Sequence, residues 1–346
     1  MRAPDLSATR LSTALDFVSP GKRTGTFRLA WSSNENPLGH YPVPVMVAVG
    51  QSMGPTVLLT AGVHGDEYEG PVALMRLFRD IDPAMLSGRL IVLPALNAPA
   101  VRAATRVSPL DGGNLNRAFP GDRNGGPTAM IAHMVETCLM PVADAVIDLH
   151  SGGKASWFVP CALAARAPDG RLDAANMALA RAFGTPLIWV LGRYNDDRSV
   201  NGAATRSGVP AIAAELGGGG TLTPAVLEIT EAGLRGCLSH LGALPGRSSL
   251  AAPTPRAVEI ATAAQSVAAS SHGLYQPLVK AGGDVVAGTL LGLVHDLDRP
   301  VGMRRKVMDV SRARDWGWTA ATGLDDGLAR TYAWYREAEG NIRGVS

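Results

Sequence analysis

The chain has 346 residues, of which 46% are hydrophobic and 18% are charged. This composition is typical of a globular protein of about two domains, and it excludes disordered and collagen-like classes. The 32 basic and 30 acidic residues leave a net charge of +2, which is too balanced for a nucleic-acid-binding surface. We therefore expect no nucleic-acid partner.

The three cysteines form no CxxC pair, which argues against a disulfide framework and favours a reducing compartment. No apolar run approaches the roughly 20 residues that a membrane helix needs. The first residues also lack the apolar core of a signal peptide. The sequence therefore predicts a cytoplasmic protein without a membrane partner, and a homo-oligomer stays open.

Apolar runs alternate with helical patterns between residues 50 and 245. Strands are expected at 55–63, 89–97, 145–150, 185–191 and 209–216. Helices are expected at 69–81, 130–143, 172–184 and 223–242. Strands that read as continuous apolar runs and alternate with helices predict an α/β domain over 1–245, with a largely parallel sheet flanked by helices.

The last hundred residues differ in composition from the rest. Residues 246–256 are small and contain prolines, which is typical of a linker. Short strands punctuated by glycine then predict a small β domain over 256–298. In the tail, residues 299–346, we expect one amphipathic helix at 324–338 with an apolar face.

Polar side chains follow three of the expected strands. His64 and Glu67 come directly after the strand at 55–63, His150 ends the strand at 145–150, and Glu215 lies at the end of the strand at 209–216. In α/β sheets, sites form in crevices at the carboxyl ends of the strands. We therefore expect these four side chains to converge.

Two histidines and one glutamate are the ligand set of a catalytic zinc site with one open position. Zinc lowers the pKa of a bound water toward ~7 and polarises a carbonyl. A further carboxylate must then move the water's proton to the leaving amine, and Glu215 is the candidate. Asp148, two residues before His150, can orient that imidazole. Each motif alone is more often structural, but their combination favours a metal site.

The segment 97–122 carries cations beside this site. Arg117 can hold a carboxylate through two hydrogen bonds, and Asn116 can add a donor. Arg106 can reach a carbonyl oxygen and stabilise an oxyanion. The alternative for each arginine is a surface ion pair.

Four motifs together resemble the succinylglutamate desuccinylase/aspartoacylase family of zinc-dependent acylamino-acid hydrolases. They are HGDEYEGP (64–71), NLNRAFPG (114–121), DLHSGG (148–153) and AELGGGG (214–220). The resemblance covers about residues 25–298. It implies a zinc-carboxypeptidase-like fold with a mixed, largely parallel sheet, and a catalytic domain over 1–245.

The resemblance also implies a role for each candidate residue. The metal ligands for one Zn²⁺ per chain are His64, Glu67 and His150. The general base and acid is Glu215, and the clamp for the substrate carboxylate is Asn116 and Arg117. Arg106 would contact the scissile carbonyl, with Arg102 as a competitor for that role.

Within the family, RVSPLDGGNLNRAFPGD (106–122), DLHSGGKASWFVP (148–160) and ELGGGGT (215–221) look like N-acetyl-diaminobutyrate deacetylases of ectoine breakdown. This implies a small N-acyl amino acid substrate with an N-acetyl group, an α-carboxylate and a distal amine. Several acidic residues stay open as partners of that amine: Asp66, Glu69, Asp111, Asp196 and Asp197.

Two further resemblances concern the end of the chain. Residues 273–294 resemble half of a biotinyl/lipoyl-type sandwich, so the β domain at 256–298 is expected to be incomplete. Residues 299–340 resemble the C-terminal end of GDP-fucose synthases, but the chain has neither a Gly-rich dinucleotide loop nor a YxxxK pair. Reductase activity is therefore not implied. Deacylation of another family substrate, carboxypeptidase activity and an inactive fusion product are the alternatives.

Overall fold

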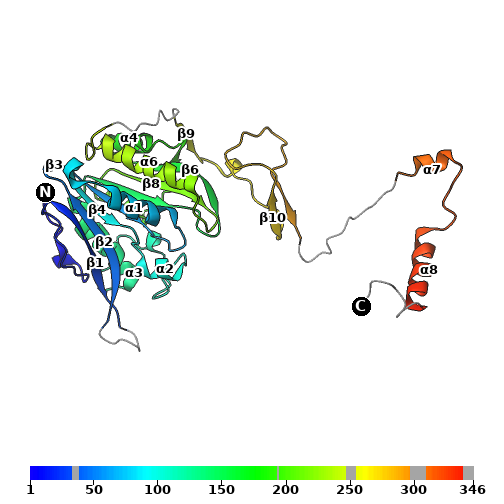
Figure 1. The fold of residues 1–346 in the computed structure, drawn as a ribbon, viewed down its shortest axis with the longest axis horizontal. Coiled ribbons are helices and arrows are strands. Elements are labelled where there is room, and N and C mark those ends of the chain that lie inside the picture. The colour runs from blue at the N-terminus through cyan, green and yellow to red at the C-terminus, as the bar shows by residue number, and fades with distance from the viewer. Residues whose placement is uncertain (33–38, 193–194, 247–254, 297–308, 338–346) are drawn as a thin grey trace. The chain divides into compact units, whose positions relative to one another are not determined.

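The computed structural model describes residues 1–32, 39–192, 195–246, 255–296 and 309–337. The described residues fall into two units. The first comprises Met1–Ala268 with Val279–Leu290, and the second comprises Ala269–Leu278 with Leu291–Ser346. Figure 1 shows their secondary structure.

The first unit is built on a nine-stranded sheet with the order β1-β2-β4-β3-β5-β8-β6-β7-β9. The strands are β1 (Gly21–Ala30), β2 (His40–Val49), β3 (Ser52–Ala61), β4 (Ser87–Leu93), β5 (Ala145–His150), β6 (Trp157–Ala165), β7 (Leu187–Leu191), β8 (Ala211–Gly218) and β9 (Arg256–Glu259). The central strands β4, β3, β5 and β8 are parallel to one another. Antiparallel pairing joins β1 to β2, β2 to β4 and β6 to β8. The predicted mixed, largely parallel sheet is confirmed.

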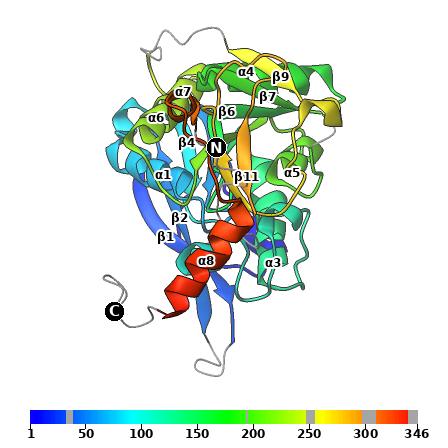
Figure 2. The same cartoon turned by 90° about the vertical axis from the view of Figure 1, so that its right-hand side faces the viewer.

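Helices cover both faces of this sheet (Figures 1 and 2). They are α1 (Glu69–Asp80), α2 (Ala98–Ala103), α3 (Pro127–Met134), α4 (Gly170–Phe183), α5 (Val200–Arg206) and α6 (Pro224–His240). The helix predicted at 130–143 is interrupted. After α3 come a π turn, Val135–Leu139, and a 3-10 turn, Met140–Val142, because Pro141 cannot continue an α-helix.

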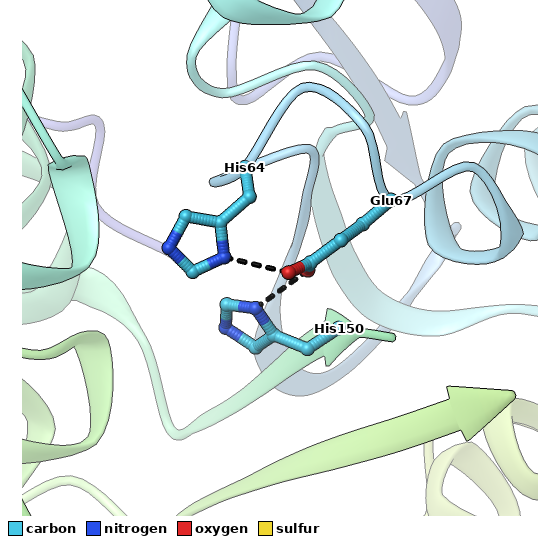
Figure 3. Close-up of side chains that lie close together, drawn as sticks. All are labelled: His64, Glu67 and His150. Atoms are coloured by element: carbon cyan, nitrogen blue, oxygen red, sulfur yellow. Dashed lines mark hydrogen bonds and ion pairs between the residues drawn. The ribbon is translucent and has the colours of Figure 1, made fainter. Parts of the chain in front are cut away.

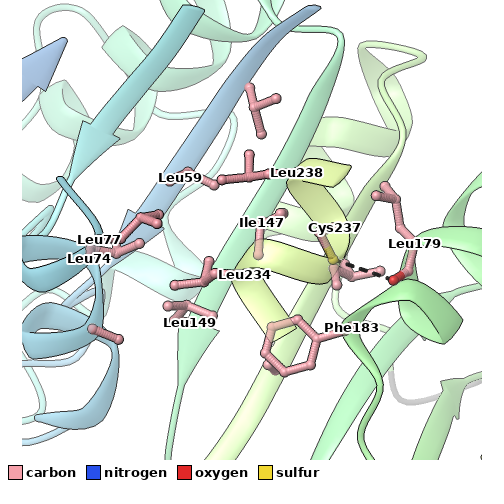
Figure 4. Packing of buried hydrophobic residues seen from close by; sticks show 14 of the residues in the cluster. Leu59, Leu74, Leu77, Ile147, Leu149, Leu179, Phe183, Leu234, Cys237 and Leu238 are labelled. Atoms are coloured by element: carbon pink, nitrogen blue, oxygen red, sulfur yellow. Dashed lines mark hydrogen bonds between the residues drawn. The ribbon is translucent and has the colours of Figure 1, made fainter. Parts of the chain in front are cut away.

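Alternate residues of each central strand enter separate cores. Leu59 of β3 and Ile147 of β5 pack with α1, α4 and α6, whereas their neighbours Leu58 and Val146 pack on the opposite face with α3 and α5. Figure 4 shows the first core, with Leu234 of α6 among the strand side chains. Because both faces are covered, apolar residues of these strands point to both sides of the sheet.

Strand β9 follows the predicted linker, yet it pairs in parallel with β7 of the large sheet, Leu187 opposite Arg256. Most of that linker, residues 247–254, lies outside the described residues. In the second unit, β10 (Leu274–Pro277) and β11 (Gly292–His295) form a two-stranded antiparallel sheet. The domain division at 256 and 299 stays a prediction.

The tail contains α7 (Ser311–Asp315) and α8 (Leu324–Glu337). Helix α8 coincides with the predicted amphipathic helix at 324–338 except for its last residue, which lies outside the described residues. The tail positions 299–308 also lie outside them. The predicted apolar face is exposed, with Leu324 at 78% and Tyr332 at 62% exposure. No helix in the described part of the chain is long and apolar enough to cross a membrane.

Candidate active site

Four of the predicted site residues lie in or directly after three neighbouring parallel strands, β3, β5 and β8. His64 and Glu67 lie in the loop between β3 and α1, and His150 is the last residue of β5. Glu215 lies in β8 directly opposite His150 in the strand register. The donor atoms of His64, Glu67 and His150 all lie within 4.8 Å of one another. The three strands therefore bring these side chains to one place, although Glu215 lies within β8 rather than at the end of its strand.

The glutamate lies between the two histidines (Figure 3). Its Oε1 is 2.7 Å from Nδ1 of His64, and its Oε2 is 2.9 Å from Nδ1 of His150. All three side chains are buried, at 2%, 3% and 6% exposure for His64, Glu67 and His150. Two imidazole nitrogens and a carboxylate, convergent and shielded from water, are ligands that zinc prefers.

The outer nitrogen of each imidazole has its own acceptor. Nε2 of His64 donates to Oδ1 of Asn114 over 3.0 Å, and Nε2 of His150 donates to Oδ2 of Asp148 over 2.7 Å. Thr60 in turn donates to the other oxygen of Asp148. These bonds keep the Nε2 protons in place and direct both Nδ1 atoms toward Glu67, so the residues fit a metal ion.

Charges at the site stabilise one another. Burial alone would raise the pKa of Glu67, but His150 and His64 lower it to about 2. Burial alone would lower the pKa of His150, but Asp148 and Glu67 raise it well above its ordinary value. Glu67 is therefore a carboxylate, as a metal ligand must be.

Glu215 is in a different environment. Burial raises the pKa of its carboxyl to about 8. Its Oε2 is buried and has no hydrogen-bond partner among the described residues. A carboxyl with a raised pKa and a free oxygen beside a candidate metal site is suited to accepting and returning a proton.

A cavity of about 320 Å³ opens beside these groups. All seven predicted site residues border it: His64, Glu67, Arg106, Asn116, Arg117, His150 and Glu215. Arg106 lies with Nη1 3.2 Å from Oε1 of Glu67. Its competitor Arg102 does not border the cavity, and its guanidinium lies 5.9 Å from the Tyr41 ring centroid.

The predicted carboxylate clamp is held by the segment that leads into α5. Oδ1 of Asn116 accepts the backbone N–H of Val200 over 3.2 Å. Nε of Arg117 lies 3.0 Å from Oδ2 of Asp196. Each clamp side chain therefore has one contact with this segment, and that contact orients it before a ligand binds.

Of the acidic residues left open as partners of an amine, two border a cavity at the site. Asp66 borders the cavity described above, and Asp196 borders a second cavity that adjoins it. Asp111 instead accepts two hydrogen bonds from Thr128. Glu69 and Asp197 border neither cavity.

Sequence reasoning missed two groups that shape the site. Asn114 fixes His64, and the backbone N–H of Ser151 donates to Oε2 of Glu67 over 3.2 Å. Asn114 lies two residues before Asn116 in the NLNR run, but nothing in that spacing indicates that it faces a histidine 50 residues earlier. Only the fold brings the two together.

Comparisons with known proteins place the chain in a family. A family model described as the succinylglutamate desuccinylase/aspartoacylase catalytic domain matches residues 53–241. The N-alpha-acetyl-L-2,4-diaminobutyric acid deacetylase of Halomonas elongata is 36% identical over 323 residues, 92% of this chain and 94% of that protein. The product-bound ectoine utilization protein EutE (DoeB) of Ruegeria pomeroyi superposes with a TM-score of 0.79 at 37% identity, over 85% of this chain and 88% of its own.

The fold and its relatives define a deacylase, an enzyme that hydrolyses amide bonds in small molecules. The chain belongs to the succinylglutamate desuccinylase/aspartoacylase family, as its motifs predicted.

A second, short similarity is separate from this family. The putative GDP-L-fucose synthase 2 of Arabidopsis thaliana is 49% identical over 45 residues, 13% of this chain and 14% of that enzyme. The predicted likeness to GDP-fucose synthases is therefore confirmed. It covers too little of such an enzyme to carry its activity.

Proposed function

We propose that the chain is a zinc-dependent deacetylase and that its substrate is Nα-acetyl-L-2,4-diaminobutyrate, the compound in the name of its Halomonas relative. The substrate comes from that relative, which matches nearly the whole chain. The chemistry rests on one observation, the convergence of His64, Glu67 and His150 beside the unpartnered carboxyl oxygen of Glu215. Buried free thiols at all three cysteines fit the reducing cytoplasm, where we place the protein.

His64 and His150 would hold the metal through their Nδ1 atoms, and Glu67 would hold it through a carboxylate oxygen. A zinc ion in that position supplies Lewis acidity to the acyl carbonyl and acidity to a water molecule. Glu215 accepts the proton of the attacking water and delivers it to the leaving nitrogen. The carbonyl carbon gains a C–O bond and loses its C–N bond, which releases acetate and the free amine.

The remaining residues position the substrate. Arg117 and Asn116 bind its α-carboxylate, so the scissile amide is placed at a fixed distance from Glu215. Arg106 borders the same cavity and donates to the carbonyl oxygen as negative charge develops on it.

The direct test is acetate release from Nα-acetyl-L-2,4-diaminobutyrate, with N-acetyl-L-aspartate and N-succinyl-L-glutamate in parallel assays. We expect release from the first compound, loss of release after chelation, and recovery on addition of zinc. Turnover by metal-free protein, verified by elemental analysis, would contradict the role of zinc. Hydrolysis of only another compound, such as a short peptide, would support the hydrolytic mechanism but contradict the proposed substrate.

The metal ligands have a separate test. His64→Ala should lose stoichiometric zinc because one of three ligands is gone. His240→Ala is the matched control, since this exposed histidine at the end of α6 lies outside the site. Full zinc content in His64→Ala would remove that residue from the ligand set.

A further inference from the structure

The second cavity, of about 260 Å³, adjoins the first and shares five lining residues with it: Asn116, Arg117, His150, Phe158 and Glu215. It is bordered by neither His64 nor Arg106. In the proposed reaction, Arg117 holds the α-carboxylate and Glu215 protonates the leaving nitrogen. The α-carboxylate and the leaving nitrogen both belong to the amino-acid half of the substrate. That half therefore faces the second cavity, and the acyl half faces the first.

The segment that holds the clamp also lines this second cavity. Val200, whose N–H binds Asn116, is followed directly by Asn201, and Asp196, which binds Arg117, is preceded by Asn195. Asn195, Asp196 and Asn201 all border the cavity. A side chain that leaves the substrate's α-carbon beside the clamp therefore reaches these residues within a few bonds.

Besides Oε2 of Glu215, three polar atoms at the second cavity are buried without a partner among the described residues. They are Oδ1 of Asn195, Oδ1 of Asn201 and Nε1 of Trp189. Asn201 is 7% exposed, so water does not compensate its amide. Buried polar groups that no protein atom satisfies are costly to keep, unless a ligand satisfies them.

The charge and the walls of the cavity indicate what that ligand is. An amide can present its oxygen or its nitrogen to a ligand, so the two asparagines do not by themselves indicate the charge of the ligand. Among the described lining residues, Asp148, Asp196 and Glu215 are carboxylic. Asp148 is paired with His150, and Arg117 is occupied by the α-carboxylate. The rings of Phe158 and Trp189, 6.5 Å apart, form an aromatic wall. Carboxylates and aromatic faces both favour a cation.

We infer that the second cavity is the subsite for the amino-acid side chain, and that Asn201 with Asn195 selects a short side chain ending in an ammonium group. The inference rests on the proposed function for the position of the α-carboxylate. Asp196 is already bound by Arg117 and Arg198, so the asparagine oxygens are the groups that accept the ammonium protons. The two methylenes of diaminobutyrate suit a subsite this close to the clamp.

Substrates that differ only at the end of the side chain test the subsite. N-acetyl-L-norvaline carries a methyl group where the diaminobutyrate compound carries the ammonium, and N-acetyl-L-glutamate carries a carboxylate. We expect kcat/KM to favour the ammonium substrate over the methyl one by about tenfold or more, since hydrogen bonds to charged groups are strong. Equal kcat/KM for the two would overturn the inference, while acetate release itself would still support the deacetylase.

Variants of Asn201 provide the second test. Asn201→Leu should lower the preference for ammonium over methyl about tenfold, and Asn201→Asp, which keeps the shape, should retain or raise it. Asn124→Leu, at an exposed position outside both cavities, is the matched control and should leave kcat/KM unchanged for both substrates. An equal loss on both substrates in Asn201→Leu and Asn201→Asp would mean a structural role and overturn the inference.

Product binding separates the subsite from the reaction. Calorimetry with the full chain should give tighter binding of L-2,4-diaminobutyrate than of L-norvaline, and Asn201→Leu should abolish the difference. That result with no acetate release would support the subsite while contradicting the proposed function. Indistinguishable binding of the two amino acids would overturn the subsite.

Discussion

Glu67 connects most of the groups at the candidate site. Its Oε1 faces His64 and Arg106, and its Oε2 faces His150 and the backbone N–H of Ser151. A carboxylate buried this deeply is stable only because each oxygen has two partners of positive or donor character. The same contacts hold the two histidines in place, so the ligand set is arranged before a metal binds.

Glu215→Gln keeps the size of the side chain and removes its ability to accept a proton. We expect zinc content to stay unchanged and kcat to fall on the order of 10²- to 10⁴-fold, the usual contribution of a general base. Elemental analysis and acetate release measure the two quantities. Glu228→Gln, at an exposed position of α6, is the control. Near-normal turnover in Glu215→Gln would refute the proton-transfer role.

Asn114→Ala removes the acceptor that orients His64. Groups that orient a ligand typically contribute about 10- to 100-fold to metal affinity. We therefore expect zinc affinity to fall by that factor while the circular dichroism spectrum stays unchanged. Competition against a chelator of known affinity measures the effect, with Asn124→Ala as the matched control. The same affinity in both variants would show that Asn114 does not position His64.

At the scale of elements, the loop between β3 and α1 depends on helix α2. Gly65 lies against the α2 backbone so closely that an added Cβ would be 2.0 Å from the carbonyl carbon and oxygen of Ala100. Its N–H also donates to the carbonyl of Thr105 over 2.9 Å. The glycine is therefore required by packing, and it sets where the flanking His64 and Glu67 point.

Gly65→Ala should consequently move the loop away from α2. We expect a loss of about 1–3 kcal/mol in the free energy of unfolding, as for other overpacked sites, together with a loss of bound zinc. Thermal denaturation and metal analysis measure the two effects. Gly170→Ala, the first residue of α4, is the control because its added Cβ would meet no atom within 4 Å. If the two variants behave alike, the packing argument is wrong.

At the scale of the whole molecule, the proposed site and the tail belong to different units. Every site residue lies within Met1–Ala268, which contains the large sheet and both of its main cores. Helix α8, in the other unit, has no buried residue. A unit with its own core can fold and act independently. We therefore expect that the GDP-fucose-synthase-like tail is not needed for the chemistry.

A chain truncated after residue 298 tests this independence. We expect the same zinc content and the same rate of acetate release as the full chain, because no site residue and no residue of either main core is removed. Thermal denaturation of the first unit should also be unchanged. Loss of turnover with zinc still bound would instead assign the tail a role in catalysis or assembly.

The sequence alone predicted most of the central elements and the residue types of the site. Buried strands such as 145–150 are largely apolar, His150 ends such a strand and Glu215 follows the apolar run of another, so local pattern and residue chemistry were sufficient. The strands β1, β2 and β6 were missed. Strand β1 has an alternating, largely polar sequence, and β6 is interrupted by Pro160, so neither has the continuous apolar pattern.

Only the tertiary structure decided between alternatives that one sequence leaves open. Arg106 rather than Arg102 borders the cavity, Asp196 rather than Asp111 faces the clamp, and Asn114 meets His64. Each of these depends on the distance between segments far apart in the chain. A sequence pattern records how a segment folds and what chemistry it carries, but the order of strands in the sheet determines which segments meet.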